Sequence, residues 1–338
     1  MPGSLTIPNV LAGIAGPANA NLSLLDGNWN QIRDYVNNRE IVQDTFANRP
    51  AASIAGRWFF ATDTAVLYAD TGAAWTQVAL GTLSATFAET LTGLGLTNSA
   101  GDLTNDIDCA VGAASSEDAV IANRVLMSLT SALTKQLDVA WAVGTNQGGR
   151  MSAAGIANTT YHIHLIRRTD TGVVDVGFDT SATAPTLPAN YTRSRRIGAI
   201  IRSAGAILGF VQDADLFQLN TPVLDVDANN PGTGAVTRTL TVPIGIQVIA
   251  RLNGYATSTI ATTTVILLSD LAIPDVAASS TVAPLGQLAI YAGANVDAVQ
   301  VDIRTNTSGQ IRSRFEQSDA STSLRLATTG WFDRRGRG

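Results

Sequence analysis

The sequence is poor in cysteine and in charged residues, and both shortages restrict how the protein can be stabilised. Cys109 is the only cysteine among 338 residues, so no disulfide can form within the chain. Charged residues make up 14% of the sequence, compared with about 25% in an average soluble protein. Apolar residues account for 45%, which is not the composition of a disordered chain. We therefore expect stability to come from apolar burial and from assembly with other chains.

Basic residues are also scarce. Lys135 is the only lysine, and the formal net charge is −5. Proteins that bind nucleic acid neutralise phosphates with clustered lysine and arginine, so nucleic acid is not an expected partner. The one basic cluster, Arg334, Arg335 and Arg337, is expected to be a solvated or carboxylate-paired tail.

Neither a signal peptide nor a membrane span is predicted. The first residues, Met1 to Ser4, lack a basic segment. The longest apolar stretch, residues 199–211, contains Arg202 and is shorter than the ~20 apolar residues that a membrane helix needs. These features predict a soluble protein made in a cytoplasm, without membrane insertion.

The length predicts two or three structural units, beginning with an N-terminal attachment segment at residues 1–45. Residues 1–20 are rich in Pro, Gly, Ala and Asn and predict an extended arm. A helix is predicted to begin at Asn21 or Ser23, since both residue types cap helix N-termini. Its large apolar residues are alternately three and four apart, as in a coiled-coil seam: Leu22, Leu25, Trp29, Ile32 and Val36.

Two interpretations of this helix stay open. The spacing is typical of a short seam between copies of the chain, and it also occurs in an amphipathic helix that packs on its own domain. Because residues 1–45 have no core of their own, we expect them to order only against a partner.

Residues 46–82 predict a small three-stranded β-meander. Its strands are residues 57–61, 66–68 and 74–78, separated by turns at 62–64 and 70–72. About 35 residues make too small a core to stand alone, so this unit is expected to pack on partners or on copies of itself. Residues 83–106 are interpreted as a connector.

Residues 107–338 contain many short alternating segments separated by turn signals, with no helical stretch between them. This pattern predicts an antiparallel β-sandwich of jelly-roll type. No repeat of fixed period occurs, which argues against a β-helix or a propeller. The expected fold class is therefore mainly β, with a short N-terminal helix, a small meander and a C-terminal sandwich.

The chain resembles the fibre and appendage proteins of tailed bacteriophages over most of its length. The similar segments are the opening (7–9 and 22–29), the meander (46–51, 56–63 and 67–68), the distal region (137–144, 159–162, 168–172, 190–192 and 195–198) and the ending (330–337). The resemblance implies a homotrimer on a virion, with the N-terminus bound to other virion proteins. It carries over no catalytic residue, and it leaves a location on the tail or on the head open.

Candidate metal ligands are few. His162 and His164 are the only histidines, and residues two apart on a strand share a face. Six imidazoles of a trimer could meet at one metal ion, but the absence of a third ligand type nearby favours one histidine at a core edge and one in solvent. The segment from Asp225 to Asn229 is similar to the start of a calcium loop, yet Asn230 and Val236 stand where that loop needs glycine and an acid. No metal and no cofactor are expected.

Catalytic groups are equally sparse. Asp213 with Asp215, and Asp302 with Glu316, could be paired carboxylates for glycoside cleavage, although solvated turn acids are the favoured interpretation. No Gly-x-Ser-x-Gly elbow accompanies the two histidines. We expect that the protein is not an enzyme.

Aromatic side chains could stack on sugars, although strand aromatics are more often core. The candidates include Trp141, Trp331, Tyr161 and Tyr255, and Tyr191 is the preferred surface residue because Pro188 and Asn190 beside it predict a loop. Binding residues of all-β domains tend to lie on loops, and the longest polar connectors here are residues 144–156 and 180–195. They supply the predicted receptor contacts Asn146, Gln147, Arg150, Asn190, Tyr191 and Arg193.

The leading functional hypothesis is a trimeric tail fibre or receptor-binding protein that contacts a host surface glycan. A head fibre, decoration or tail adaptor with a purely structural role is the alternative. A polysaccharide depolymerase is the third hypothesis.

Overall fold

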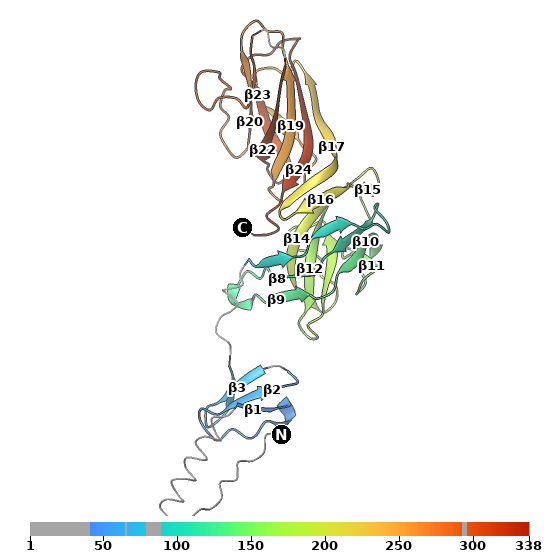
Figure 1. The fold of residues 1–338 in the computed structure, drawn as a ribbon, viewed down its shortest axis with the longest axis vertical. Helices are drawn as coiled ribbons and strands as arrows, with labels where there is room; N and C mark the ends of the chain where they lie inside the picture. The colour runs from blue at the N-terminus through green and yellow to red at the C-terminus, as the bar shows by residue number, and fades with distance from the viewer. Residues whose placement is uncertain (1–40, 65, 79–88, 293–295, 338) are drawn as a thin grey trace, which may run out of the picture. The chain divides into compact units, whose positions relative to one another are not determined.

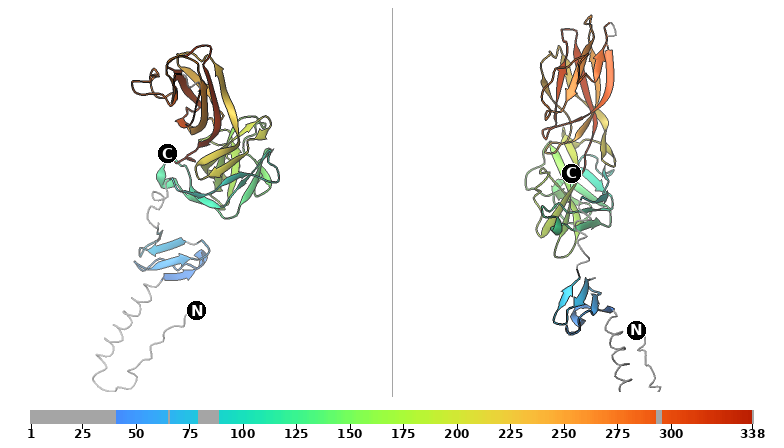
Figure 2. Two further views of the ribbon diagram at one scale, coloured as in Figure 1. Left: turned by 45° about the horizontal axis from the view of Figure 1, so that its top comes forward. Right: turned by 90° about the vertical axis from the view of Figure 1, so that its left-hand side faces the viewer.

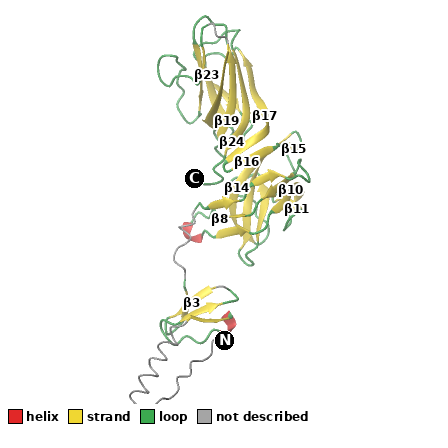
Figure 3. Cartoon of the chain, in the orientation of Figure 1, coloured by secondary structure: helices red, strands yellow, loops and turns green. Residues whose placement is uncertain are grey.

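The computed structural model describes residues 41–64, 66–78, 89–292 and 296–337. The chain divides into two compact units, Met1–Leu83 and Ser84–Gly338. The predicted N-terminal arm and helix, with the seam residues Leu22, Leu25, Trp29, Ile32 and Val36, lie outside the described residues. The described part is mainly β, as expected, and its helical segments in Figure 3 are two short 3-10 turns, η1 (Phe46–Asn48) and η2 (Ile121–Asn123). Within that part, no helix has the length and apolar character needed to cross a bilayer.

The first unit contains a four-stranded sheet in the order β1-β2-β3-β4 (Figure 1). The strands β2 (Trp58–Ala61), β3 (Val66–Asp70) and β4 (Trp75–Gln77) form the antiparallel meander that the turn signals predict. The strand β1 (Ile41–Asp44) adds a parallel edge beside β2. Residues 41–44 were expected in the attachment segment, and they belong to this sheet because their backbone pairs with residues 58–61.

The interior of this small sheet contains the ring of Phe59 and the carboxylate of Asp70. Phe59 is fully buried, and its ring meets Trp75 edge-on at 5.9 Å between centroids. The carboxylate of Asp70 accepts hydrogen bonds from the backbone N–H groups of Ser53 (3.0 Å) and Gly72 (2.8 Å) and from Arg57 (2.7 Å). Burial opposes ionisation of Asp70, but these donors hold its pKa below the usual range.

The second unit begins with an eight-stranded sheet and a three-stranded sheet. The larger sheet contains, from edge to edge, β15 (Ala206–Ile207), β14 (Tyr191–Ser203), β12 (Thr160–Arg168), β13 (Val174–Asp179), β11 (Gln147–Arg150), β10 (Leu133–Ala140), β7 (Asp106–Cys109) and β6 (Leu96–Asn98). The smaller sheet contains β5 (Leu91–Gly93), β8 (Gly112–Ser115) and β9 (Leu126–Leu129).

Two expectations for this region are wrong. Residues 91–93 and 96–98, interpreted as part of a connector, are strands because they pair with β8 and β7. The sheet is also not purely antiparallel, since β11 runs parallel to both β10 and β13. The ammonium of Lys135 on β10 donates to the carbonyls of Ala142 and Gly144. These bonds hold residues 142–144 against β10, and the chain then continues as β11.

The remaining strands form two antiparallel sheets that face each other (Figure 1). One has the order β16-β17-β24-β19-β22, and the other β18-β23-β20-β21. Their bounds are β16 (Phe210–Asp213), β17 (Leu216–Asn229), β18 (Val236–Thr239), β19 (Ile249–Thr257), β20 (Thr264–Ser269), β21 (Leu288–Ile290), β22 (Val296–Arg304), β23 (Gln310–Phe315) and β24 (Ser323–Phe332).

From β17 to β24, successive strands alternate between these two sheets except at β20 and β21. This is the strand order of an eight-stranded jelly roll. The sandwich therefore covers residues 216–332, and residues 89–215 form a second body beneath it in the same unit.

The C-terminal tail fastens the jelly roll to this second body. Trp331 stacks on Phe217 with ring planes 5° apart, inside one apolar core that runs through both bodies. The carboxylate of Asp333 accepts two bonds from Arg196 (2.6 and 2.8 Å), and Arg335 donates to the carbonyl of Ile197 (2.6 Å). The basic tail is thus largely committed to carboxylates and carbonyls rather than free to bind phosphate.

Candidate functional site

The six predicted receptor contacts differ in their exposure and in the bonds that they make. Asn146, Gln147 and Asn190 are exposed. Arg150 donates to the carbonyls of Leu137 and Asp138 at 3.2 and 3.1 Å. Arg193 forms an ion pair with Asp118, so neither guanidinium is held free for a ligand.

The expectation that Tyr191 lies at the surface is wrong. Its side chain is 5% exposed, and its ring meets Trp141 edge-on with centroids 5.0 Å apart. The turn ends at Asn190, and Tyr191 is already the first residue of β14. Two connectors far apart in sequence therefore share one aromatic contact, which the local loop pattern could not reveal.

Tyr191→Phe is expected to leave the free energy of unfolding within about 1 kcal/mol of the parent chain or to raise it, because the buried hydroxyl has no hydrogen-bond partner among the described residues. Urea denaturation of both proteins measures the difference. A loss larger than this would show that the hydroxyl makes a bond that the structure lacks.

Both histidines are buried, contrary to the expectation that one faces solvent. The Nε2–H of His162 donates to the carbonyl of Ile244 (3.1 Å), and that of His164 donates to the carbonyl of Ser181 (3.0 Å). Burial lowers the pKa of each imidazole to about 4. In the part of the chain that the structure describes, no group of three or more His, Cys, Asp or Glu side chains is arranged to hold a metal ion.

The candidate acids are also not paired with one another. Asp215 pairs with Arg337, and Asp302 pairs with Arg251 (3.2 Å). Glu316 follows β23 in the opposite sheet and accepts bonds from Ser280. Asp225 accepts bonds from Thr241 and Thr328, so the resemblance of its segment to a calcium loop has no counterpart in its contacts.

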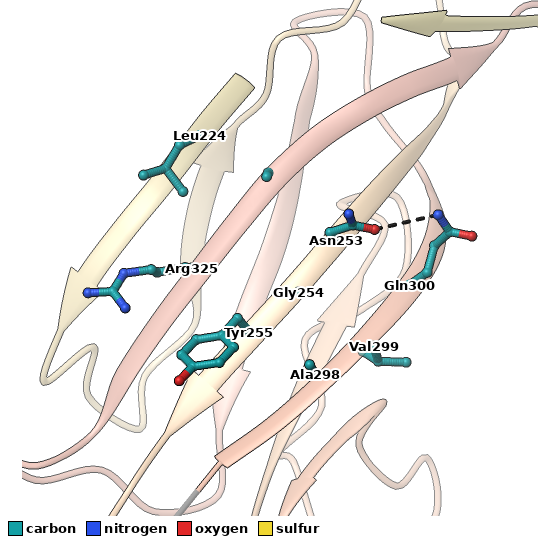
Figure 4. A pocket seen from close by; sticks show the side chains of 9 residues that line it. Leu224, Asn253, Gly254, Tyr255, Ala298, Val299, Gln300 and Arg325 are labelled. Atoms are coloured by element: carbon teal, nitrogen blue, oxygen red, sulfur yellow. Dashed lines mark hydrogen bonds between the residues drawn. The ribbon is translucent and has the colours of Figure 1, made fainter. Parts of the chain in front are cut away.

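A shallow groove lies instead on the outer face of the five-stranded sheet of the jelly roll (Figure 4). Its volume is about 470 Å³. Strand register places its lining in two cross-strand rows. The first row is Arg325, Tyr255 and Ala298; the second is Leu224, Ala327, Asn253 and Gln300.

Small residues make the groove possible. Ala298 and Ala327 stand where larger side chains would fill the face, and the backbone of Gly254 lies between the two rows. The ring of Tyr255 borders this floor and is 37% exposed. A flat aromatic surface is thereby left open beside the sheet, as Figure 4 shows.

Polar groups surround the tyrosine. The amides of Asn253 and Gln300 lie next to each other, 3.5 Å apart, and Arg325 donates through Nε to Asp227 at 3.0 Å. The terminal nitrogens of an arginine so held can donate hydrogen bonds, and the two amides can both donate and accept them. None of the nine residues that line the groove carries a carboxyl group. The arrangement suits binding of a polyhydroxylated ligand.

The sequence contained a signal for this site that loop-based reasoning missed. Along β19, Ile249, Arg251, Asn253 and Tyr255 alternate with buried Ala250, Leu252 and Ala256. A tyrosine in phase with arginine and asparagine points outward. The cross-strand neighbours of Tyr255 on β24 and β22 could not be identified from the sequence.

Comparison with known proteins adds little to this description. No protein-family model and no curated protein matches the sequence. Among solved structures, a Major Tropism Determinant P3c variant is similar over 56% of this chain and 50% of its own length, with 14% identity and a TM-score of 0.22. An exo-β-1,3-galactanase from Phanerochaete chrysosporium is similar over 80% of this chain and 64% of its own, with 12% identity and a TM-score of 0.17. At these values neither similarity assigns a fold or a function.

Proposed function

We propose that this chain is a homotrimeric virion appendage of a tailed bacteriophage, a tail fibre or receptor-binding protein that binds a host surface glycan through the jelly-roll groove. The resemblance of the sequence to phage fibres supports the virion location and the trimer. The observation that carries the binding role is the exposed ring of Tyr255 over a floor of alanines, flanked by two amides and a guanidinium.

The physical basis is the amphipathic character of a sugar ring. Its C–H face packs on an aromatic ring, and its hydroxyls bond to planar amide and guanidinium groups. An open groove on a sheet admits a chain that continues at both ends, as a polysaccharide does. In this proposal residues 1–45 attach the protein to other virion proteins, and three copies of a weak site bind by avidity.

Tyr255→Ala is expected to weaken binding at each site about tenfold, or roughly 1.4 kcal/mol, without lowering the unfolding midpoint, since the side chain is partly exposed. An array of bacterial surface polysaccharides, probed with the full chain, measures the binding. Tyr291→Ala is the matched control, because Tyr291 is 66% exposed and lies outside the groove.

Three results would contradict the proposal. Equal binding of the parent and Tyr255→Ala would remove the groove from consideration. Absence of binding to every polysaccharide would favour a purely structural head fibre or adaptor. Shortening of a bound polysaccharide would favour a depolymerase.

A further inference from the structure

A cavity of about 430 Å³ lies where the C-terminal tail meets the second body. Three segments far apart in sequence line it: strand β5 with the glycine at 95, the β16–β17 hairpin, and the tail that follows β24. The volume is within the range of ~300–1,000 Å³ that is typical of small-molecule sites. The cavity is separate from the jelly-roll groove, since the two share no lining residue. The orientation of the tail in the unit can be followed in Figures 1 and 2.

Arg335 is a buried cation in the wall of this cavity. It is 4% exposed. Its guanidinium donates through Nε to the carbonyl of Ile197 (2.6 Å) and through Nη2 to the carbonyls of Gly93 and Leu94. Its third nitrogen, Nη1, has no acceptor among the described residues, and it is not one of the enclosed nitrogens that lack a partner. Nη1 therefore remains accessible to a ligand in the cavity that Arg335 lines.

No carboxylate of the described residues forms an ion pair with Arg335. Asp333 pairs with Arg196, and Asp215 pairs with Arg337. Burial lowers the pKa of Arg335, and the charges of Asp215 and Asp333 oppose that effect. A buried charge without a counter-ion of its own is costly. An anion bound at Nη1 would therefore be stabilised by a charge that is already present.

The charge of the lining favours a ligand with one negative charge. Arg335 and Arg337 contribute two positive charges and Asp215 contributes one negative charge, so one positive charge is in excess. A carboxylate matches this excess, and its two oxygens fit the planar fork of a guanidinium. A sulfate dianion would bring a second negative charge close to Asp215.

The neutral polar groups of the lining suit hydroxyls. Thr92 is exposed, and its hydroxyl forms no side-chain bond within the described residues. The amide of Gln212 is held in place, because Oε1 accepts from the N–H of Leu96 (2.7 Å) and Nε2 donates to the carbonyl of Ala214 (2.7 Å). One N–H of this amide is left for a ligand. A small molecule with a carboxylate and several hydroxyls would use both kinds of group.

We propose that this cavity binds a small hydroxylated carboxylate, of the class of the hexuronic acids, with its carboxylate at Arg335 and Arg337. Because Arg335 also bonds to Ile197 and Leu94 of the second body, a bound ligand strengthens the attachment of the tail to that body. Binding to the folded chain alone raises the midpoint of thermal unfolding. The site is independent of the groove on the jelly roll and of the number of chains in the assembly.

Isothermal titration calorimetry of the full chain tests the site, with glucuronate as the probe. Glucose is one matched ligand, because it has the same ring without the carboxylate. Acetate is the other, because it has the carboxylate without the ring. Glucuronate is expected to bind, and glucose and acetate are expected to bind about tenfold more weakly or less, since each lacks one of the two kinds of group that the cavity engages.

Two variants alter the cavity in different ways. Arg337→Gln removes one positive charge, and Arg334→Gln is its control, because Arg334 is exposed on the same tail and does not line the cavity. Gly95→Leu fills the space, since a Cβ at Gly95 would meet no heavy atom within 4 Å. Gly155→Leu is its control, because the space around Gly155 is equally open and Gly155 lies outside the cavity.

Both cavity variants are expected to weaken glucuronate binding about tenfold or more, through the loss of a charged hydrogen bond or of space, and both controls to bind like the parent chain. Thermal unfolding without ligand shows that each variant is folded. Absence of glucuronate binding overturns the site, and so does binding that neither cavity variant weakens. Glucose that binds as tightly as glucuronate overturns the role of the carboxylate. Acetate that binds as tightly indicates an adventitious ion only and overturns the ligand class.

Discussion

Lys135→Met is expected to destabilise the second unit by about 3–5 kcal/mol, the usual cost of removing one partner of a buried ion pair. Lys135 and Asp175 are each 1% exposed at the side chain, and Nζ lies 3.0 Å from Oδ1. The ammonium also donates to the carbonyls of Ala142 (2.6 Å) and Gly144 (3.0 Å). Burial lowers the pKa of Lys135, and the carboxylate of Asp175 opposes that effect.

The loss is large because methionine replaces the volume of lysine and none of its three bonds. Asp175 would keep its bonds from the N–H groups of Gly144 (2.7 Å) and Val176 (2.6 Å) but would be a buried charge without a counter-ion. Urea denaturation followed by tryptophan fluorescence measures the change in stability, since the centroid of the Trp141 ring lies 5.2 Å from Nζ of Lys135.

The double variant Lys135→Met with Asp175→Asn is the control. It removes both charges, so it is expected to recover a substantial part of the lost stability. A single variant that costs less than about 1 kcal/mol would mean that solvent reaches this pair. A double variant as unstable as the single one would assign the cost to packing instead of charge.

Acidification is expected to destabilise the second unit between pH 6.5 and about pH 4. The two histidines have an ordinary pKa of 6.5 and a folded-state pKa of about 4. In this window the unfolded chain binds more protons than the folded chain, so stability falls as the pH falls. A shift of this size corresponds to about 3 kcal/mol for each histidine.

Other titratable groups change the stability in a different pH range or in the opposite direction. Asp102 and Asp319 have lowered pKa values, so their stabilising effect is lost below the ordinary pKa of an aspartate. Burial raises the pKa of Glu117 and of Asp106, and their protonation in the folded state offsets part of the loss near pH 4. The midpoint of thermal unfolding measured from pH 7 to pH 4 reports the sum.

His164→Gln is the variant that isolates one histidine. The amide nitrogen of glutamine can replace Nε2 as donor to the carbonyl of Ser181, and it does not titrate in this range. The variant should therefore show about half of the pH dependence of the parent chain. An unchanged slope would mean that His164 is not the group that takes up the proton.

The sequence by itself determined the class of fold and much of its local structure. Alternation and turn signals depend on neighbours along the chain. The short strands that they predicted within residues 107–338 occur there, as β19 and β23 illustrate. The pairing of the C-terminal arginines was also an expected alternative, because isolated charges near a core need partners.

Tertiary structure decided the features that depend on which distant segments meet. The parallel strand β11 follows from the buried bonds of Lys135, and the burial of Tyr191 follows from its contact with Trp141. The groove exists because register aligns Tyr255 with Arg325 and Ala298. Tyr255 lies 43 and 70 positions before its two partners, and strands so far apart in sequence can pair in many registers. The periodicity along each strand is the same in every one of these registers. Local pattern therefore specified the strands, and side-chain packing across the sheets specified the site.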